Sequence, residues 1–177
     1  MSGRAAGREY EKMHPLRKKT EKPAEAYCEL VLVQHELSKK IHQELFSFDE
    51  SRYIMAGNDI LESILALAGQ GVDKMHIAAD WKHLLMIALW MPSQPSVFDV
   101  MNLLKKYGAS DDELAPFRTS DADDFFPWLY YGRKFDMLRK ICNAAKAKAE
   151  SRVSRKHMHI ICHLVSEDTS RIVASSL

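Results

Sequence analysis

The sequence predicts an all-α fold, either a stack of antiparallel helical hairpins or a compact helical bundle. Runs of alternating Val, Ile and Thr, which are typical of half-buried strands, are scarce. Apolar residues recur instead at helical spacing in several segments. The chain has 177 residues, of which 46% are hydrophobic and 28% charged. It is therefore long enough to bury a core and ordinary in composition for a globular domain.

The sequence predicts a basic arm over residues 1–22 and a single helical domain over residues 23–177. The arm has few apolar residues, so we expect it to be mobile. From Pro23 onward, apolar residues recur at helical spacing as far as Phe46, which predicts one long helix. His35 and His42 lie seven residues apart on one face of this helix and are interpreted as surface or boundary residues.

Two shorter helices are predicted before residue 70. Ser47 and Glu50 have the spacing of a capping box and predict the start of the first. Asn58 or Asp59 can cap the second, which is expected to end at Gly69.

The clearest helical hairpin covers residues 80–110. Residues 80–91 are apolar on almost every face, as expected of a buried helix, and two prolines then end it. Ser96 can cap a second helix, and Gly108 follows its last apolar turn, where a left-handed residue commonly ends a helix. The rest of the chain is interpreted as copies of this hairpin and as caps around it.

The remainder of the chain is also expected to be helical. Ser110 and Glu113 again have capping-box spacing. A polar loop is predicted over residues 118–124, and a further hairpin follows it. Residues 147–177 are expected to form a C-terminal helical cap that contains a final apolar helix.

The hairpin at residues 80–110, which ends in L-L-K-K-Y-G-A-S, resembles an ankyrin repeat, and weaker copies extend the resemblance over residues 58–146. Leu85 and Ala88 fit the first helix of the repeat, whereas its Thr-Pro and His positions have no equivalent. The resemblance implies a degenerate ankyrin-like scaffold that binds another protein through a concave surface. By analogy with small ankyrin-like proteins, it also implies a bacterial effector that acts on host proteins.

A cluster of aromatic residues after an acidic run predicts where a partner protein would bind. Trp and Tyr are enriched at binding hot spots because they bury a large area with little loss of entropy. The predicted partner-binding residues are Phe125, Trp128, Tyr130, Tyr131, Asp123 and Asp124.

No catalytic residue, cofactor or metal site is predicted, because the common phosphate-binding, hydrolase, zinc-protease and calcium-binding motifs are missing from the sequence. An all-α enzyme or enzyme regulator with a site among the histidines and acidic loops remains the main alternative. The best metal candidates are His157, His159, Cys162 and His163. They are predicted to lie on one helix, which cannot surround a tetrahedral ion.

Nucleic-acid binding is a further alternative, through a basic C-terminal face. The residues of that face are Arg133, Lys134, Arg139, Lys140, Lys146, Lys148, Arg152, Arg155 and Lys156. Homo-oligomerisation is also left open. Three cysteines without a CxxC pair, together with no apolar run that could span a bilayer, favour a reducing cytoplasmic location, or the host cytosol for an effector.

Overall fold

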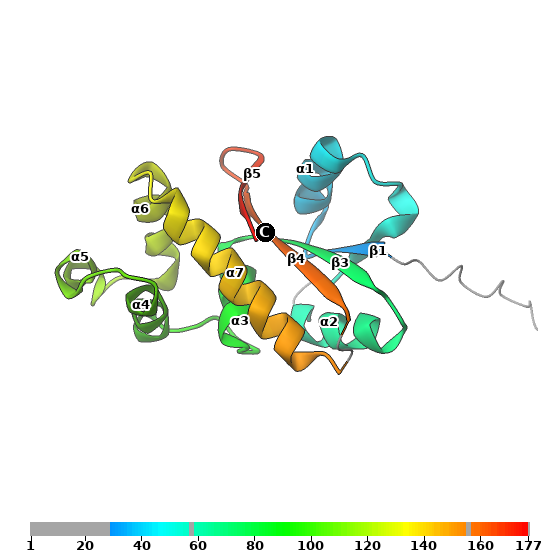
Figure 1. Cartoon of the computed structure of the whole chain (residues 1–177). Helices are drawn as coiled ribbons and strands as arrows, with labels where there is room; N and C mark the ends of the chain where they lie inside the picture. Colours follow the sequence, from blue (N-terminus) through cyan, green and yellow to red (C-terminus); the bar gives the residue numbers. More distant parts are fainter. Residues whose placement is uncertain (1–28, 57–58, 155–156, 177) are drawn as a thin grey trace, which may run out of the picture.

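The computed structural model describes residues 29–56, 59–154 and 157–176 and shows an α/β fold built around a five-stranded sheet (Figure 1). The prediction of an all-α fold, whether as stacked hairpins or as a bundle, is therefore wrong. The predicted basic arm, residues 1–22, lies outside the described residues. The strands are β1 (Glu29–Val33), β2 (Tyr53–Met55), β3 (Lys74–Ala79), β4 (His159–Ser166) and β5 (Arg171–Ser175). The α-helices are α1 (Glu36–Phe46), α2 (Ile60–Gly69), α3 (Trp81–Leu89), α4 (Val97–Lys106), α5 (Asp111–Leu114), α6 (Phe125–Tyr131) and α7 (Phe135–Arg152).

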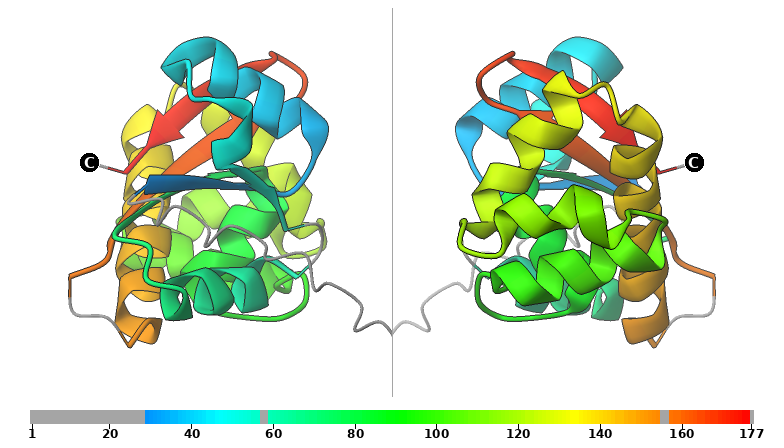
Figure 2. Two further views of the ribbon diagram at one scale, coloured as in Figure 1. Left: turned by 90° about the vertical axis from the view of Figure 1, so that its right-hand side faces the viewer. Right: turned by 90° about the vertical axis from the view of Figure 1, so that its left-hand side faces the viewer.

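The sheet has the spatial order β2-β1-β3-β4-β5, with the first four strands parallel and β5 antiparallel to β4. The connection from β1 to β2 runs through α1 on one face of the sheet. The later connections to β3 and β4 run through α2, α3 and α7 on the other face (Figure 1, Figure 2). The chain therefore leaves the neighbouring strands β1 and β3 toward opposite faces. Their carboxyl ends form a topological switch point, the place where doubly wound sheets bind ligands.

Side chains alternate between the two faces along the central strands. In β1, Leu30 and Leu32 pack into the large core with α2, α3 and α7, whereas Val31 and Val33 face α1. The apolar cluster on the α1 face is much smaller and includes Ile41 of α1. On this face, β3 and β4 each place a buried histidine where an aliphatic residue would be ordinary.

The strands account for the errors in the predicted helices. The helix predicted from Pro23 contains β1 followed by α1, and the predicted helical cap over residues 147–177 contains β4 and β5. Strands of a parallel sheet are buried on both faces, so they read as continuous apolar runs. Such runs, here E-L-V-L-V and H-I-I-C-H-L-V, cannot be distinguished from a buried helix by periodicity alone.

Several helix boundaries are confirmed. Ser96 and Ser110 cap α4 and α5 through complete capping boxes, with Asp99 and Glu113 as their partners. Gly108 follows α4 with a φ of 109°, which a residue with a side chain rarely adopts. In the part of the chain that the structure describes, no helix is long and apolar enough to cross a membrane.

Candidate functional site

The residues after β1 form the first part of a polar cluster at the switch point. His35 is the N-cap of α1, and its Nδ1 accepts a hydrogen bond from the Ser38 amide at 3.1 Å. That bond needs a lone pair on Nδ1, so the ring in this arrangement carries its proton on Nε2. Nε2 lies 2.6 Å from a carboxylate oxygen of Glu167, at the start of the β4–β5 turn. His35 therefore serves as a helix cap with one nitrogen and donates a hydrogen bond to a carboxylate with the other.

Gln34 connects the ends of β1 and β3. In the amide orientation that satisfies its neighbours, its nitrogen donates to the carbonyl of Ala78 at 2.6 Å. Its oxygen accepts from the Ser38 hydroxyl and from the Asp80 amide, each at 2.9 Å. Gln34 is buried, so these bonds hold the two strand ends in a fixed relation.

The end of β3 supplies a carboxylate–imidazole pair. Asp80 is the N-cap of α3, and its Oδ1 accepts from both the amide nitrogen and the ring Nδ1 of His83, each at 2.8 Å. The Nδ1 proton is thereby fixed, which leaves Nε2 with a lone pair. The His83 side chain is only 9% exposed, and among the described residues its Nε2 has no hydrogen-bond partner. A buried imidazole held in this tautomer is arranged to accept a proton.

The electrostatics of the cluster favour an ionised Asp80. Burial acts to raise the pKa of this carboxyl, but hydrogen bonds from the side chain and backbone of His83 outweigh it. The result is a pKa below the ordinary aspartate value. A permanent carboxylate is the form that holds the His83 Nδ1 proton.

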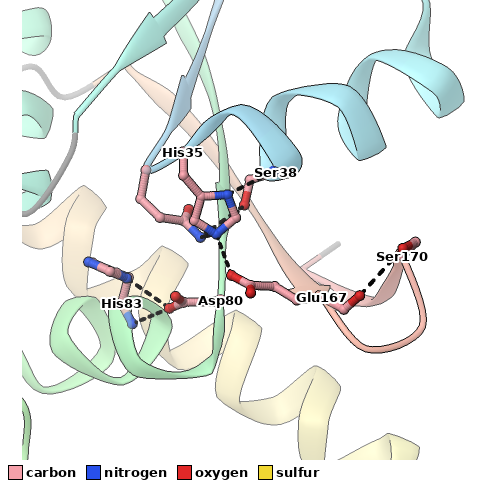
Figure 3. A network of polar contacts seen from close by, with 7 residues as sticks. His35, Ser38, Asp80, His83, Glu167 and Ser170 are labelled. Atoms are coloured by element: carbon pink, nitrogen blue, oxygen red, sulfur yellow. Dashed lines mark hydrogen bonds and ion pairs between the residues drawn. The ribbon is translucent and has the colours of Figure 1, made fainter.

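The ends of β1 and β3 and the β4–β5 turn together supply the residues of this switch-point cluster, which are Gln34, His35, Asp80, His83 and Glu167. One ligand atom from each of His35, Asp80 and Glu167 lies within 4.8 Å of the others (Figure 3). The Glu167 side chain is 52% exposed, so this edge of the sheet is open to solvent. His35 could bind a divalent cation through Nε2 only in its other neutral tautomer, with the proton on Nδ1, and that tautomer would break the hydrogen bond from the Ser38 amide.

The predicted partner-binding residues occupy different environments. Phe125 is fully buried in the main core, while Trp128 and Tyr130 pack partly against it. Tyr131 is 70% exposed, and Trp128 lies beside a surface hollow under Lys134. Asp123 accepts a hydrogen bond from Gln94, and Asp124 accepts one from the Asp121 amide in the turn that precedes α6. Nothing in these positions tests whether a partner protein binds, so the partner surface remains a prediction.

The four metal candidates do not meet at one point. Cys162 faces the main core, whereas the neighbouring strand residue His163 faces α1. His159 has a side chain that is 53% exposed, and His157 is also exposed. The burial of Cys162 raises its pKa well above the ordinary value, as burial does for Cys142, which fits packing rather than reactivity.

Sequence reasoning missed the site at the switch point. His35 and His42 were interpreted as surface or boundary residues on one helix face. His35 is partly exposed and caps α1, whereas His42 is buried, so the interpretation is wrong for His42. The available signal was Asp80-Trp-Lys-His83, in which an acid caps a helix and reaches a histidine three residues later. That signal becomes meaningful only once the preceding residues are known to form a strand.

A comparison with known proteins finds sequence similarity to an enzyme. Over 140 residues, the chain is 29% identical to the cobalt-precorrin-5B C(1)-methyltransferase of Desulfotalea psychrophila. The match covers 75% of this chain and 38% of that protein, so the chain spans well under half the length of this curated relative. No family profile matches the chain, and no solved structure does.

Proposed function

We propose that this chain is an enzyme domain with its active site at the carboxyl ends of β1 and β3, and that the Asp80–His83 pair accepts a proton there. The observation that carries the proposal is the unpartnered, buried Nε2 of His83 beside a fixed carboxylate. A buried polar atom without a partner costs about 1–3 kcal/mol. A substrate group that donates a hydrogen bond to this nitrogen would remove that cost.

The position of the pair supports the same reading. Ligands of doubly wound sheets bind outside the carboxyl ends of the strands at the switch point. His35 and Glu167 lie on the solvent side of the same edge, where a hydrogen-bonding substrate could contact them. Gln34 and the two helix caps hold these groups on rigid elements, as a catalytic arrangement requires.

The reaction class that we propose is transfer of a methyl group to carbon. The relative's name describes methylation of a cobalt-precorrin, and the similar segment includes three quarters of this chain. When an unsaturated carbon attacks an electrophilic methyl group, a carbon–methyl bond forms and the bond to the donor breaks. The positive charge left on the acceptor is removed by loss of a proton. His83 Nε2 would take that proton, and Asp80 would stabilise the imidazolium that results.

A methyl-transfer assay tests this proposal. The purified chain is incubated with cobalt-precorrin-5B and S-adenosylmethionine as methyl donor, and the methylated product is measured by mass spectrometry. We expect His83→Gln to lower turnover by about 10²–10⁴-fold, because general-base catalysis contributes that much. His159→Gln is the matched control, since it removes an exposed histidine away from the site, and should leave turnover unchanged.

Two outcomes would contradict the proposal. Equal turnover in the wild type and His83→Gln would remove the catalytic role of His83. A wild-type protein that is folded by circular dichroism but transfers no methyl group to cobalt-precorrin-5B would exclude this substrate and donor pair.

A further inference from the structure

Three buried histidines meet on the α1 face of the sheet, away from the switch point. His42 comes from α1, His76 from β3 and His163 from β4. All three are essentially inaccessible to solvent. Parallel pairing of β3 and β4 aligns Ala78 with His163, so His76 and His163 lie two residues apart in register on the same face. Their rings are stacked at 5.2 Å between centroids, and the His42 ring meets both edge-on.

One nitrogen of each ring points to a common centre. His42 Nε2 lies 3.4 Å from His76 Nδ1, and His76 Nδ1 lies 3.0 Å from His163 Nε2. Three imidazole nitrogens around a tetrahedral zinc-type ion, with metal–nitrogen bonds of about 2.0–2.1 Å, are separated by roughly 3.3 Å. Two of the three nitrogen pairs are therefore already near the spacing that a shared ion would impose, and all three nitrogens lie within 4.8 Å of one another.

The outer nitrogen of each ring has an oxygen partner. His42 Nδ1 lies 3.0 Å from the Tyr53 hydroxyl, and His163 Nδ1 lies 2.7 Å from the Ser175 hydroxyl. The third ring, His76, places its Nε2 3.1 Å from a carboxylate oxygen of Glu29. If each outer nitrogen donates, each inner nitrogen presents a lone pair. A second shell that holds each metal-binding imidazole through its other nitrogen is the usual arrangement in proteins.

The surroundings keep the rings uncharged, which is the form that binds metal. Burial, with the positive charges of neighbouring histidines, lowers the pKa of His42 and of His163 to about 3. Burial also lowers the pKa of His76, although Glu29 acts in the opposite direction. The alternative to a metal is a set of neutral histidines in which the rings of His42 and His163 both donate hydrogen bonds to His76. The hydroxyl partners can rotate to suit either case, and measured metal binding distinguishes the two.

We propose that His42, His76 and His163 bind one divalent transition-metal ion of the zinc type, through Nε2, Nδ1 and Nε2 respectively. Imidazole nitrogens favour Zn²⁺ and its neighbours over Mg²⁺ and Ca²⁺, which prefer oxygen. No fourth His, Cys, Asp or Glu ligand belongs to this group among the described residues. A tetrahedral ion would therefore keep one position for water, as in three-histidine catalytic sites. Phe46 and Phe48 lie against the rings, and Phe46, at the end of α1, is 39% exposed.

Metal binding by the intact, tag-free protein tests the site. After loading with Zn²⁺ and dialysis against metal-free buffer, we expect about one zinc per chain by mass spectrometry of the metal. Co²⁺ should give the intense visible bands of a tetrahedral site. His42→Gln and His163→Gln should each weaken binding by at least about 100-fold, more than the roughly 10–100-fold that loss of an outer partner costs. The matched control His159→Gln, which alters an exposed histidine, should retain the wild-type affinity.

The wild type alone can decide the question if a variant fails to fold. Zn²⁺ or Co²⁺ should raise its melting temperature, whereas Mg²⁺ should not, because binding to the folded state shifts unfolding by mass action. The proposal is overturned if the wild type retains no zinc after dialysis and shows no metal-dependent melting shift. It is also overturned if folded His163→Gln binds zinc as tightly as the wild type does. The site shares no residue with the Asp80–His83 pair, so its failure would leave the proposed enzyme function intact.

Discussion

The switch-point cluster and the three-histidine cluster both contain histidines, but each uses the two nitrogens of the imidazole ring in a different way. At the switch point, Asp80 holds the Nδ1 proton of His83, and one nitrogen is left free to accept a proton. Under α1, the outer nitrogens of three rings have oxygen partners, and the inner nitrogens face each other at 3.0–3.4 Å. The first arrangement has one lone pair, on a buried nitrogen whose ring is held by a carboxylate. The second has three ring nitrogens that converge away from solvent.

The difference shows that a histidine's role depends on what its second nitrogen contacts and on its burial. An anionic partner such as Asp80 stabilises the imidazolium and so favours proton transfer. Two of the three buried rings have hydroxyl partners instead, and burial opposes any positive charge on them. Such rings are poor bases but good neutral ligands.

The largest effect that we expect is on turnover in Asp80→Asn. Asparagine is as good an N-cap as aspartate, so α3 should keep its stability. The amide, however, would present a donor to His83 Nδ1 and would favour the wrong tautomer. Turnover in the methyl-transfer assay should fall by about 10³–10⁴-fold, while zinc content stays the same. A fall in zinc content would show that the two clusters are not independent.

Acid should destabilise the fold mainly through the buried cluster. An unfolded histidine has a pKa of about 6.5, whereas His42 and His163 have values of about 3 in the folded protein. Between these values the unfolded chain binds more protons, so stability is complete above about pH 6.5 and is lost as the pH falls toward 3. For one such histidine alone, we expect the free energy of unfolding to fall by about 2 kcal/mol between about pH 7 and pH 5. Urea unfolding with a chelator present measures this change.

The variant His163→Gln separates this effect from other acid effects. It removes one group that is held neutral, so the dependence of unfolding free energy on pH should become shallower. His159→Gln, at an exposed position, should keep the wild-type dependence. A wild-type stability that is constant over this pH range would contradict the depressed pKa values.

Loss of a second-shell hydroxyl should have a smaller effect, confined to metal binding. In Tyr53→Phe, His42 loses the oxygen partner of its Nδ1 but keeps its place in the cluster. Zinc affinity should fall by about 10–100-fold, measured by competition with a chelating dye. Methyl transfer should be unaffected, since Tyr53 is not part of the switch-point cluster. An unchanged zinc affinity would show that the hydroxyl does not orient the ring.

The smallest expected effect is on stability when the cap of α1 is removed. His35→Ala deletes the acceptor for the Ser38 amide and should cost about 1 kcal/mol in urea unfolding. His35→Asn supplies another good cap and should restore most of this stability. If His35→Ala and His35→Asn were equally stable, the capping role would be wrong, and the role of His35 would lie in its contact with Glu167.

Local signals in the sequence determined several helix boundaries. The capping boxes at Ser96 and Ser110 and the glycine after α4 act through hydrogen bonds and backbone angles within a few residues. These features need no tertiary contact, which is why they could be predicted. The helices near residues 60–69 and 81–89 were predicted from their apolar residues and from the glycine and prolines that lie at or after their ends, which are also local features, although Asp59 makes no side-chain capping bond at the start of α2.

Only the tertiary structure decided that the apolar runs at β1, β3 and β4 are strands. These strands are apolar throughout because they are buried between α1 on one face and the other helices on the opposite face. Their sequences therefore lack the apolar–polar alternation that would predict a strand. The two clusters depend on this sheet, because parallel pairing brings His76 and His163 together across 87 positions and aligns the ends of β1 and β3. Each histidine was visible in the sequence, but its partners come from separate strands and helices. Residue type is a local property, whereas the protonation and ligand geometry of a histidine depend on distant neighbours.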